Sequence, residues 1–485
     1  MSVGISGLSL YLPPYRVQLQ DWCAWNDESW EKTRSVVGQS FRMRGPGQSV
    51  YTMAATAVLR LITDFEVDPQ DVGMLILGTE SSSDNSAGAI IVKGMVDDAL
   101  VASGRAPLAR DCEVPEFKHA CLSGIYGLKA AIRYLSADGA ARKAIVVCSD
   151  IAEYALGSTG EPTQGAGAVA MLIDGEARLL EVDLVGSGSD SSYRTVDFRK
   201  PFARFRQPPR DDGQMQDLPV FNGRYSTSCY IDATRHAMAA MLAKRGGRQS
   251  AFFAEIDRAF MHRPYNQMPT TGWVMAYLFA LASDESGRKQ LLEYCDAAGI
   301  AGDKLLAELD NLSPFDESVI SGETDGDVYP LSRKLRQYLR GLDLWQTLVS
   351  EKLKLGSNWM RDLGNLYSGA LPAWLAAGLR EAVDSGLDLS GEQWVALGYG
   401  SGDAAEAIPM RVSARWAQTA TRINFPEALG NPTDLTEAQY LALHEGRTGD
   451  LQPVASHAEF VVDSVGTQDL PDFQNLGIEF YRYIP

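Results

Sequence analysis

The residue in this sequence best suited to nucleophilic chemistry is Cys121. It stands in EFKHACLSG, where an extended segment turns into the apolar helical pattern of residues 122–135. A thiol at the start of a helix is favoured as the thiolate, because the helix dipole and the free backbone amides stabilise negative charge there. Those amides could also stabilise an oxyanion. The alternative for any single thiol is a buried structural cysteine.

Two further polar residues follow Cys121 in the chain. His262 stands in MHRPYNQMP, just after a strand-like run, and Asn365 stands in LGNLYSGAL, ahead of an apolar helical pattern. A polar group at a strand end can face a cleft, and an Asn before a helix can cap it. A structural histidine and a simple N-cap are the alternatives. Cys, His and Asn in this order indicate acyl-thioester condensation on a thiolase-type fold.

A carboxylate is also placed for chemistry. Glu80 stands in LGTESSSDNS, at the C-terminal end of the buried-strand run of residues 72–77. Ligands bind at that edge of a parallel sheet, and a carboxylate shielded from water there can serve as a general acid or base. The alternative is a hydrated loop glutamate.

The elements that must position these residues alternate between strands and helices. Buried-strand runs at residues 72–77, 144–147 and 166–173 are typical of a covered sheet, and the helical pattern of residues 122–135 separates the first two. Strand, helix and strand in this rhythm predict parallel pairing with helices on both faces. The fold class is therefore α/β, and the N-terminal segment MSVGISGLSLYLPPYRV reads as one of its strands.

The second half of the chain repeats this pattern. Residues 226–245 predict a long helix, residues 251–260 end in a strand, and residues 394–397 form another strand. We expect two similar halves, residues 1–180 and residues 181–485. A charged helical insertion at about residues 273–351 interrupts the second half and is not expected to form a domain of its own.

The composition excludes several classes of protein. The 485 residues include 62 acidic and 44 basic ones, for a formal net charge of −18, which disfavours nucleic acid and anionic membranes as partners. No apolar run is long enough for a transmembrane helix. Six cysteines without a CxxC pair predict reduced thiols in the cytoplasm, and five histidines without zinc-ligand spacing predict no metal site.

Longer blocks carry a resemblance to a known family. GTESSSDNS, EFKHACLSG, EPTQGAGAVAMLI, VDFRKPF, MHRPY, GNLYSGAL and GYGSG occur in this order. The sequence resembles the hydroxymethylglutaryl-CoA synthase family from about residue 4 to residue 440. This resemblance implies a thiolase-like αβαβα fold built from two pseudo-symmetric halves, and a homodimer.

The resemblance also implies roles for individual residues. Cys121 matches the nucleophile acetylated by acetyl-CoA, Glu80 the general acid/base, and His262 the residue that engages the acetoacetyl thioester. The other matches are polar residues around or behind the acyl groups, namely Asn365, Ser401, Asp150, Asp197 and Tyr367. The Ser401 amide is expected to be an oxyanion donor beside that of Cys121.

Three features depart from the family pattern. Leu122 replaces an aromatic residue after the nucleophile, Gln267 replaces a lysine that faces the coenzyme, and the stretch between His262 and Asn365 is long. They are expected to alter the acyl pocket, the coenzyme phosphate contacts and the entrance. A basic segment carrying Arg199, Lys200 and Arg204 is a candidate for binding phosphates of CoA or phosphopantetheine, and a solvated loop is its alternative.

The implied reaction condenses acetyl-CoA with acetoacetyl-CoA to give 3-hydroxy-3-methylglutaryl-CoA, as in the mevalonate pathway to isoprenoids, without a metal or redox cofactor. A polyketide β-branching synthase acting on groups held by an acyl carrier protein is the nearest alternative. The EPTQGAGAVAMLI block is more similar to mevalonate-pathway members and favours CoA. An enzyme like ketoacyl synthase III lacks the acid/base glutamate, so Glu80 counts against it. A non-catalytic acyl-binding or scaffold protein is the alternative of another class.

Overall fold

The structure is a computed structural model of the chain. It describes residues 2–82, 87–197, 199–200, 205, 218–220, 222–448, 451 and 458–485. Within these ranges no helix is long and apolar enough to cross a bilayer. All six cysteines are buried and none forms a disulfide.

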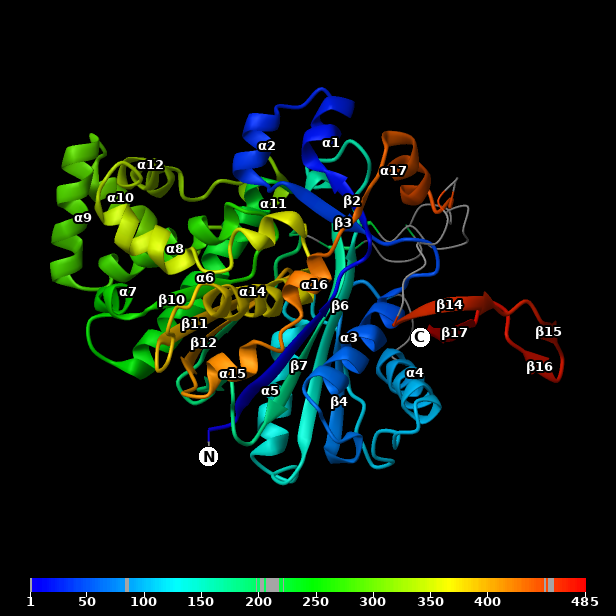
Figure 1. The fold of residues 1–485 in the computed structure, drawn as a ribbon. Coiled ribbons are helices and arrows are strands. Elements are labelled where there is room, and N and C mark those ends of the chain that lie inside the picture. Colours follow the sequence, from blue (N-terminus) through cyan, green and yellow to red (C-terminus); the bar gives the residue numbers. More distant parts are fainter. Residues whose placement is uncertain are drawn as a thin grey trace.

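A ten-stranded sheet runs through the whole molecule (Figure 1). In spatial order its strands are β10 (Arg258–Met261), β11 (Gln393–Gly400), β12 (Ala404–Val412), β8 (Leu180–Val182), β1 (Gly4–Tyr11), β7 (Gly165–Asp174), β6 (Lys143–Ala152), β4 (Val72–Gly78) and β5 (Glu116–Phe117), and β9 (Gly188–Ser191) pairs with β12. The short strand β8 pairs with both β1 and β12 and so joins two groups of strands. Residue 180, our expected boundary between the halves, is the first residue of this joining strand.

The directions of the strands agree in part with the sequence prediction. β4 and β6 are parallel and α5 lies between them in the chain, as predicted. β7 is antiparallel to β6 and to β1, so the sheet is mixed. Every residue of β1 and β4 is buried, because both faces of the sheet are covered, and this explains the uninterrupted apolar run of β4.

Helices surround the sheet and fill the space between its two groups of strands. They are α1 (Leu19–Trp25), α2 (Trp30–Val36), α3 (Val50–Asp64), α4 (Gly88–Ala102), α5 (Ser123–Leu135), α6 (Arg224–Arg245), α7 (Phe252–Glu255), α8 (Met268–Ala282), α9 (Glu285–Ala298), α10 (Gly302–Asp310), α11 (Glu317–Ser321), α12 (Pro330–Leu339), α13 (Glu351–Leu353), α14 (Ala370–Asp384), α15 (Trp416–Ala420), α16 (Phe425–Leu429) and α17 (Glu437–His444). A separate three-stranded sheet contains β13 (Thr433–Asp434), β2 (Tyr15–Gln18) and β3 (Ser40–Met43).

The layers follow from the contacts of these helices. α3 packs on β1, β6 and β7, and α6 packs on β9, β11 and β12, so each covers one outer face. Between the two groups of strands, α5 contacts β4 and β6 and reaches β11 at its first turn, while α14 contacts β1, β7, β10 and β11. This is the αβαβα arrangement of a thiolase-like fold, and it buries the first turns of α5 and α14 at the centre of the molecule.

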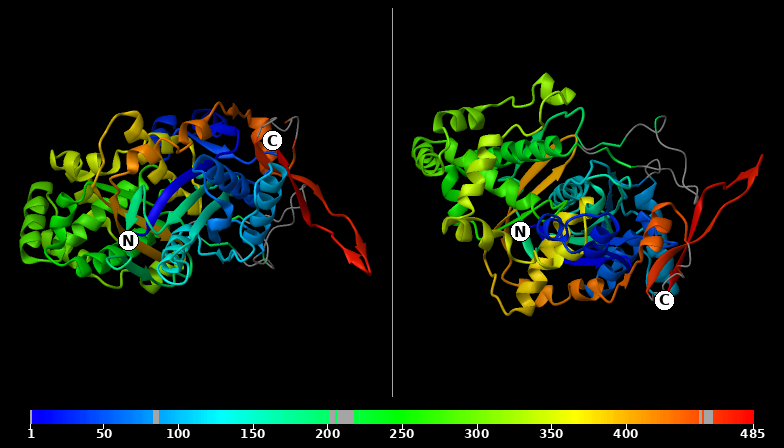
Figure 2. Two further views of the ribbon diagram at one scale, coloured as in Figure 1. Left: turned by 60° about the horizontal axis from the view of Figure 1, so that its bottom comes forward. Right: turned by 90° about the horizontal axis from the view of Figure 1, so that it is seen from above.

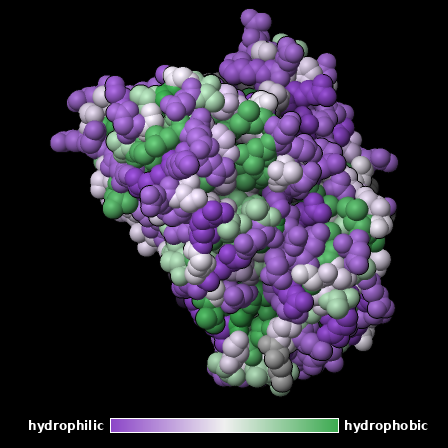
Figure 3. All heavy atoms as spheres, turned by 90° about the vertical axis from the view of Figure 1, so that its left-hand side faces the viewer, coloured by the Kyte–Doolittle hydropathy of each residue, from purple (hydrophilic) through white to green (hydrophobic). Residues whose placement is uncertain are grey.

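The expected insertion is helical. It contains most of α8 and all of α9, α10, α11 and α12. In Figure 1, α8, α9, α10 and α12 lie together on the left, and α11 is nearer the middle. α9, α10 and α12 pack against α8 and contribute buried leucines, namely Leu291, Leu305 and Leu335. The surface on this side of the molecule is mainly hydrophilic, with apolar patches between the charged areas (Figure 3).

The chain ends in a β-ribbon. β14 (Glu459–Val465) pairs with β17 (Glu479–Ile484), and β15 (Asp469–Leu470) pairs with β16 (Phe473–Gln474) farther out. The ribbon extends away from the body in both views of Figure 2. Its base is held by the Tyr11 hydroxyl, which donates to Glu459 Oε2 at 2.5 Å. Its outer part carries the exposed apolar side chains Val465, Leu470, Phe473, Leu476, Ile478 and Phe480.

Candidate active site

Cys121 lies two residues before α5, at the end of a constrained turn. Ala120 has φ of +44°, in the left-handed region that residues with a Cβ rarely adopt. The Ser123 hydroxyl holds this turn, because it donates to Ala120 O at 2.7 Å and accepts from His119 N at 2.8 Å. Strained backbone of this kind is concentrated at functional sites, where the surrounding structure maintains it.

The thiol faces the carboxylate predicted to work with it. Cys121 Sγ lies 3.5 Å from Glu80 Oε2, and the side chain is buried. Burial raises the pKa of Cys121 well above its usual value, and the charge of Glu80 raises it further. The expectation that the helix start favours the thiolate is therefore wrong for the resting site, because desolvation and the carboxylate outweigh the helix dipole. The thiol is protonated and donates to Glu80.

A buried aspartate fixes the loop that carries Glu80. Asp150 Oδ1 accepts hydrogen bonds from Glu80 N (2.8 Å), Ser81 N (3.0 Å), Ser81 Oγ (2.7 Å) and Thr79 Oγ1 (3.0 Å). Its other oxygen accepts from the Ser368 amide at 3.0 Å and from the Ser368 hydroxyl. Asp150 thus ties the end of β4 to the segment after Asn365, as expected for a residue behind the reacting groups.

His262 directly follows β10 and is buried as a neutral imidazole. Its amide donates to Leu397 O at 2.7 Å, which continues the pairing of β10 with β11. Burial lowers the pKa of His262 to about 3, and its Nδ1 atom has no hydrogen-bond partner among the described residues. A neutral imidazole can donate a hydrogen bond to a thioester or ketone oxygen without bringing a charge into the site.

Asn365 and Tyr367 belong to the turn that leads into α14. Asn365 Oδ1 accepts from Tyr367 N at 2.9 Å and so fixes the backbone just ahead of the 3-10 turn Tyr367–Gly369, whose N-cap is Leu366. Gly165 allows the turn to approach β7, because a Cβ there would lie 2.5 Å from Asn365 O. Tyr367 has φ of +44°, and burial raises its pKa well above the usual value. The turn therefore presents its side chains in one fixed arrangement.

One cavity brings most of the predicted residues together. It has a volume of about 570 Å³, and Cys121, His262, Asn365, Tyr367 and Ser401 all line it. Its remaining walls are largely apolar and aromatic and come from Val36, Val37, Tyr154, Tyr230, Pro264, Tyr265, Met268 and Tyr399. Sequence analysis did not identify these wall residues. Tyr265 and Tyr399 stand inside the MHRPY and GYGSG blocks, which could have indicated them, whereas Val36 and Val37 carry no local signal.

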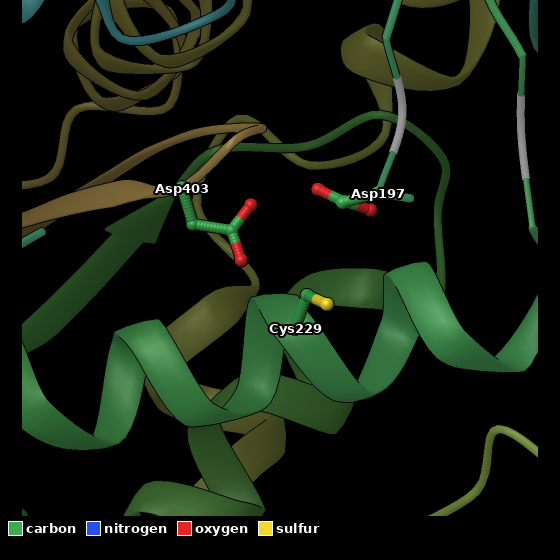
Figure 4. A group of neighbouring side chains, drawn as sticks. All are labelled: Asp197, Cys229 and Asp403. Carbon is green, nitrogen blue, oxygen red and sulfur yellow. The ribbon is translucent and has the colours of Figure 1, made fainter. Parts of the chain in front are cut away.

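Asp197 lies behind the cavity wall rather than in it. The Tyr399 hydroxyl donates to Asp197 Oδ2 at 2.8 Å and lies 3.0 Å from Asp403 Oδ1. Figure 4 shows the carboxyl groups of Asp197 and Asp403 facing each other above Cys229 of α6. The ligand atoms of these three residues lie within 4.8 Å of one another, and they form the one such metal-ligand group that the described residues contain.

Asp403 is buried beside a second carboxyl group. Burial raises the pKa of Asp403 to about 9, and the neighbouring Asp197 raises it as well. Asp403 is therefore protonated at neutral pH, and neither Asp197 Oδ1 nor Asp403 Oδ2 has a hydrogen-bond partner among the described residues. Arg194 Nε lies 3.6 Å from Asp403 Oδ2 and contributes positive charge to the cluster.

Arg199 and Lys200 of the basic segment are hydrogen-bonded to other groups of the protein. Arg199 Nη1 donates to the Tyr193 hydroxyl and to Thr195 O, each at 3.2 Å, and Lys200 Nζ donates to Glu80 O at 3.3 Å. Neither side chain lines the cavity. Arg204 lies outside the described residues.

Leu122 does not lie in the acyl pocket that it was expected to alter. Its side chain is fully buried and lies against Gly398 and Gly400 of β11. It does not line the cavity. The exchange of an aromatic residue for leucine at this position therefore affects packing between α5 and β11 rather than the acyl pocket.

Cysteine, carboxylate and neutral histidine around an apolar cavity on this fold define a thiol-dependent acyltransferase that forms carbon–carbon bonds. A family model described as hydroxymethylglutaryl-coenzyme A synthase N terminal matches residues 1–178. These residues are similar to the hydroxymethylglutaryl-CoA synthase family, and full-length relatives extend the similarity over most of the chain.

Individual relatives illustrate this similarity. The chain is 27% identical to a hydroxymethylglutaryl-CoA synthase of Enterococcus faecalis over 444 residues, which cover 91% of each chain. It is 28% identical to hydroxymethylglutaryl-CoA synthase A of Dictyostelium discoideum over 429 residues, 85% of this chain and 76% of that one.

Solved structures share the fold at lower identity. MvaS in complex with 3-hydroxy-3-methylglutaryl coenzyme A has a TM-score of 0.75 and 23% identity, and the match covers 100% of this chain and 99% of the other. The HMG synthase of the curacin biosynthetic pathway, in complex with an acetyl donor-ACP, has a TM-score of 0.69 and 18% identity over 100% of both chains. These similarities show the fold.

Proposed function

We propose that the protein condenses an acetyl group with an acetoacetyl thioester and releases 3-hydroxy-3-methylglutaryl-CoA. The observation that carries this proposal is the contact between Cys121 and Glu80 beside the cavity that His262 lines. Family similarity supplies the substrates, since the relatives above are hydroxymethylglutaryl-CoA synthases.

In the first step the acetyl group moves to Cys121. The thiol gives its proton to Glu80, and the sulfur attacks the carbonyl carbon of acetyl-CoA. The backbone amides of Cys121 and Ser401 are proposed donors to the oxyanion, a contribution of about 2.7–4 kcal/mol for one donor. The carbon–sulfur bond to CoA breaks, and the CoA thiolate takes the proton from Glu80. The products are acetyl-Cys121 and free CoA.

In the second step the acetyl group becomes the nucleophile. Glu80, again a carboxylate, removes a proton from the methyl group of acetyl-Cys121, and the enolate attacks C3 of acetoacetyl-CoA. A carbon–carbon bond forms, and the ketone oxygen takes up a proton while His262 donates a hydrogen bond to it. Water then attacks the thioester to Cys121, and the carboxylate product leaves as the thiol is restored. No metal or redox cofactor takes part in this scheme.

Product analysis by mass spectrometry tests the reaction. Purified protein with acetyl-CoA and acetoacetyl-CoA should release 3-hydroxy-3-methylglutaryl-CoA steadily. Acetylated Cys121 without product would point to another acceptor, and the absence of both would contradict the proposal.

Two variants separate the roles of the central pair. Cys121→Ser should lose acetyl-enzyme formation. Glu80→Ala should still become acetylated, because loss of the carboxylate lowers the pKa of Cys121 and water can take the thiol proton, but it should fail to condense. Cys295→Ser is the matched control for the thiol, because Cys295 is buried in α9, outside the cavity. Acetylation of Cys121→Ser on another thiol, or condensation by Glu80→Ala at the wild-type rate, would overturn these assignments.

A second candidate differs in the carrier of the acyl groups. The chain shares its fold with an HMG synthase that was solved with a donor carrier protein, and Gln267 and the helical insertion depart from the pattern of CoA-dependent members. We place CoA first because the EPTQGAGAVAMLI block is more similar to mevalonate-pathway members. Acetylation of Cys121 by an acetyl-carrier protein, and not by acetyl-CoA, would reverse this order.

The remaining proposals rest on family resemblance and composition. We propose a cytoplasmic homodimer that supplies the mevalonate pathway. Light scattering on the purified protein tests the dimer. A non-catalytic acyl-binding protein would bind the thioesters without acetylation of Cys121.

A further inference from the structure

The cavity reaches the surface beside two cations. Lys32, on α2, and Arg224, the first residue of α6, both line it and both are exposed. Arg224 forms an ion pair with Asp325, in the loop between α11 and α12 of the insertion. Lys32 has no ion pair among the described residues, although Glu31 precedes it on the same helix. One unpaired cation therefore stands at the cavity mouth.

Gln267 connects this mouth to the inserted helices. Its amide donates to Val36 O at 3.0 Å, and its side-chain nitrogen donates to Ser35 O at 3.1 Å. Its side-chain oxygen accepts from Arg340 Nη2 at 3.3 Å. Val36 and Met268, which adjoin Ser35 and Gln267 in the chain, line the cavity. Because Arg340 is bonded to Gln267, it lies close to the rim of this cavity.

Arg340 is held at this rim without a carboxylate partner. It is the exposed residue that ends α12, and its guanidinium lies over the Trp345 ring, 5.7 Å from the centroid. Among the described residues it forms no ion pair. In a chain of net charge −18, Lys32 at the mouth and Arg340 close to the rim are two unpaired cations that suit an anion.

We propose that Arg340 and Lys32 bind the phosphate at the end of the pantetheine arm, so that the insertion supplies the cation that is missing at Gln267. This inference rests on the proposed function, in which a pantetheine thioester fills the cavity. An arginine and a lysine near one rim suit a phosphate, which accepts from a planar guanidinium and from a point charge alike. CoA and a carrier protein both contain this phosphate, so the site accepts either source.

A series of acetyl donors tests the phosphate directly. The donors are acetyl-pantetheine, acetyl-4′-phosphopantetheine, acetyl-dephospho-CoA and acetyl-CoA, and the measurement is the rate of Cys121 acetylation at low donor concentration by intact-protein mass spectrometry. The variants are Arg340→Gln and Lys32→Gln. Lys334→Gln is the control, because Lys334 is an exposed cation on the same helix as Arg340.

The expected loss is confined to donors with the phosphate. Arg340→Gln and Lys32→Gln should each acetylate about tenfold more slowly with the three phosphate-bearing donors, and Lys334→Gln should not. Acetyl-pantetheine should react equally with all proteins. An equal loss with acetyl-pantetheine, or no loss with any donor, would overturn the assignment.

Two further comparisons complete the design. A carrier-protein donor should show the same loss as acetyl-4′-phosphopantetheine if carriers use this site, and a greater rate with acetyl-CoA than with acetyl-4′-phosphopantetheine would identify CoA as the source. If no donor acetylates Cys121 in the wild-type protein, the proposed function fails. If acetylation is intact but indifferent to Arg340 and Lys32, the phosphate site alone fails.

Discussion

Cys121 Sγ and Glu80 Oε2 lie 3.5 Å apart, within a buried region where the carboxylate keeps the thiol protonated. The two residues are 41 positions apart in the chain and stand at the ends of adjacent elements of the same half. One carboxylate is therefore within reach of the thiol proton in the first step and of the acetyl methyl proton in the second. The contact raises the pKa of the resting thiol and so lowers its thiolate fraction.

Removal of the Glu80 charge should make Cys121 more reactive toward a simple alkylating agent. In Glu80→Gln the pKa of Cys121 falls, because the second-largest cause of its elevation is gone, and the thiolate fraction at a given pH rises. Iodoacetamide alkylation of Cys121, followed by mass spectrometry at pH 8 in the absence of substrate, measures this. Slower alkylation of the variant than of the wild type would contradict the electrostatic argument.

Replacement of Asp150 should cost both stability and condensation. Asp150→Ala leaves the buried donors of Thr79, Ser81 and Ser368 without their acceptor, and we expect a loss of about 2–4 kcal/mol in the free energy of unfolding. Condensation should fall more than acetylation, because the Glu80 loop loses its anchor. Urea unfolding and the two half-reactions measure these effects. Asp71→Asn, at an exposed ion pair with Lys143, is the control and should change stability by less than about 0.5 kcal/mol.

Asp403 should make stability depend on pH in a direction opposite to that of most carboxylates. Its pKa is about 9 in the folded protein, against about 3.9 for an unperturbed Asp, so between these values the folded chain keeps a proton that the unfolded chain has lost. The free energy of unfolding therefore falls as pH rises, by up to about 1.4 kcal/mol per pH unit from this group. Urea unfolding of Asp403→Leu from pH 5 to pH 9 should show a flatter curve than the wild type.

The control for this experiment is Asp111→Asn. Arg142 lowers the pKa of Asp111, so its titration is complete below pH 5 and the variant should keep the wild-type slope. A slope unchanged in Asp403→Leu would mean that Asp403 does not keep its proton in the folded protein. A metal ion bound by Asp197, Cys229 and Asp403 would also displace this proton, and elemental analysis of the purified protein identifies that case.

Gly165→Ala should displace the Asn365 turn. The added Cβ would lie 2.5 Å from Asn365 O and 2.8 Å from its amide nitrogen, and both are backbone atoms that cannot move alone. We expect at least a tenfold loss of condensation with the protein still folded. Gly94→Ala is the matched control, because no atom lies within 4 Å of a Cβ there, and it should be neutral or stabilising by up to about 1 kcal/mol within α4. Equal activity of the two variants would show that the turn tolerates displacement.

The residues with chemical roles were predictable because their signals are local. Cys121, His262 and Asn365 stand near the ends of strands and helices, where a few neighbouring residues determine how the chain turns. All three line the cavity. The parallel pairing of β4 and β6 followed in the same way from the intervening α5. The motifs that a reaction requires are rich in glycine and polar residues. Such motifs can be recognised in the sequence without knowledge of tertiary contacts.

What could not be predicted depends on distant packing. The wall formed by Val36 and Val37 exists because α2 is hydrogen-bonded to residues 266 and 267, more than 200 positions away. The protonated state of Cys121 depends on burial by the whole site, which outweighs the local helix dipole. The direction of β7 is likewise set by its pairing with β1 at the other end of the half.

The C-terminal ribbon has a practical consequence for handling the protein. Its base is fastened to the body through Glu459 and Tyr11, while six exposed apolar side chains crowd the stretch from residue 465 to residue 480. An exposed strand pair of this composition promotes association between molecules and is accessible to proteases. Limited chymotrypsin digestion should therefore cut the tip first, at residues such as Phe473 and Leu476, and a chain shortened there should stay monodisperse at concentrations at which the full chain aggregates.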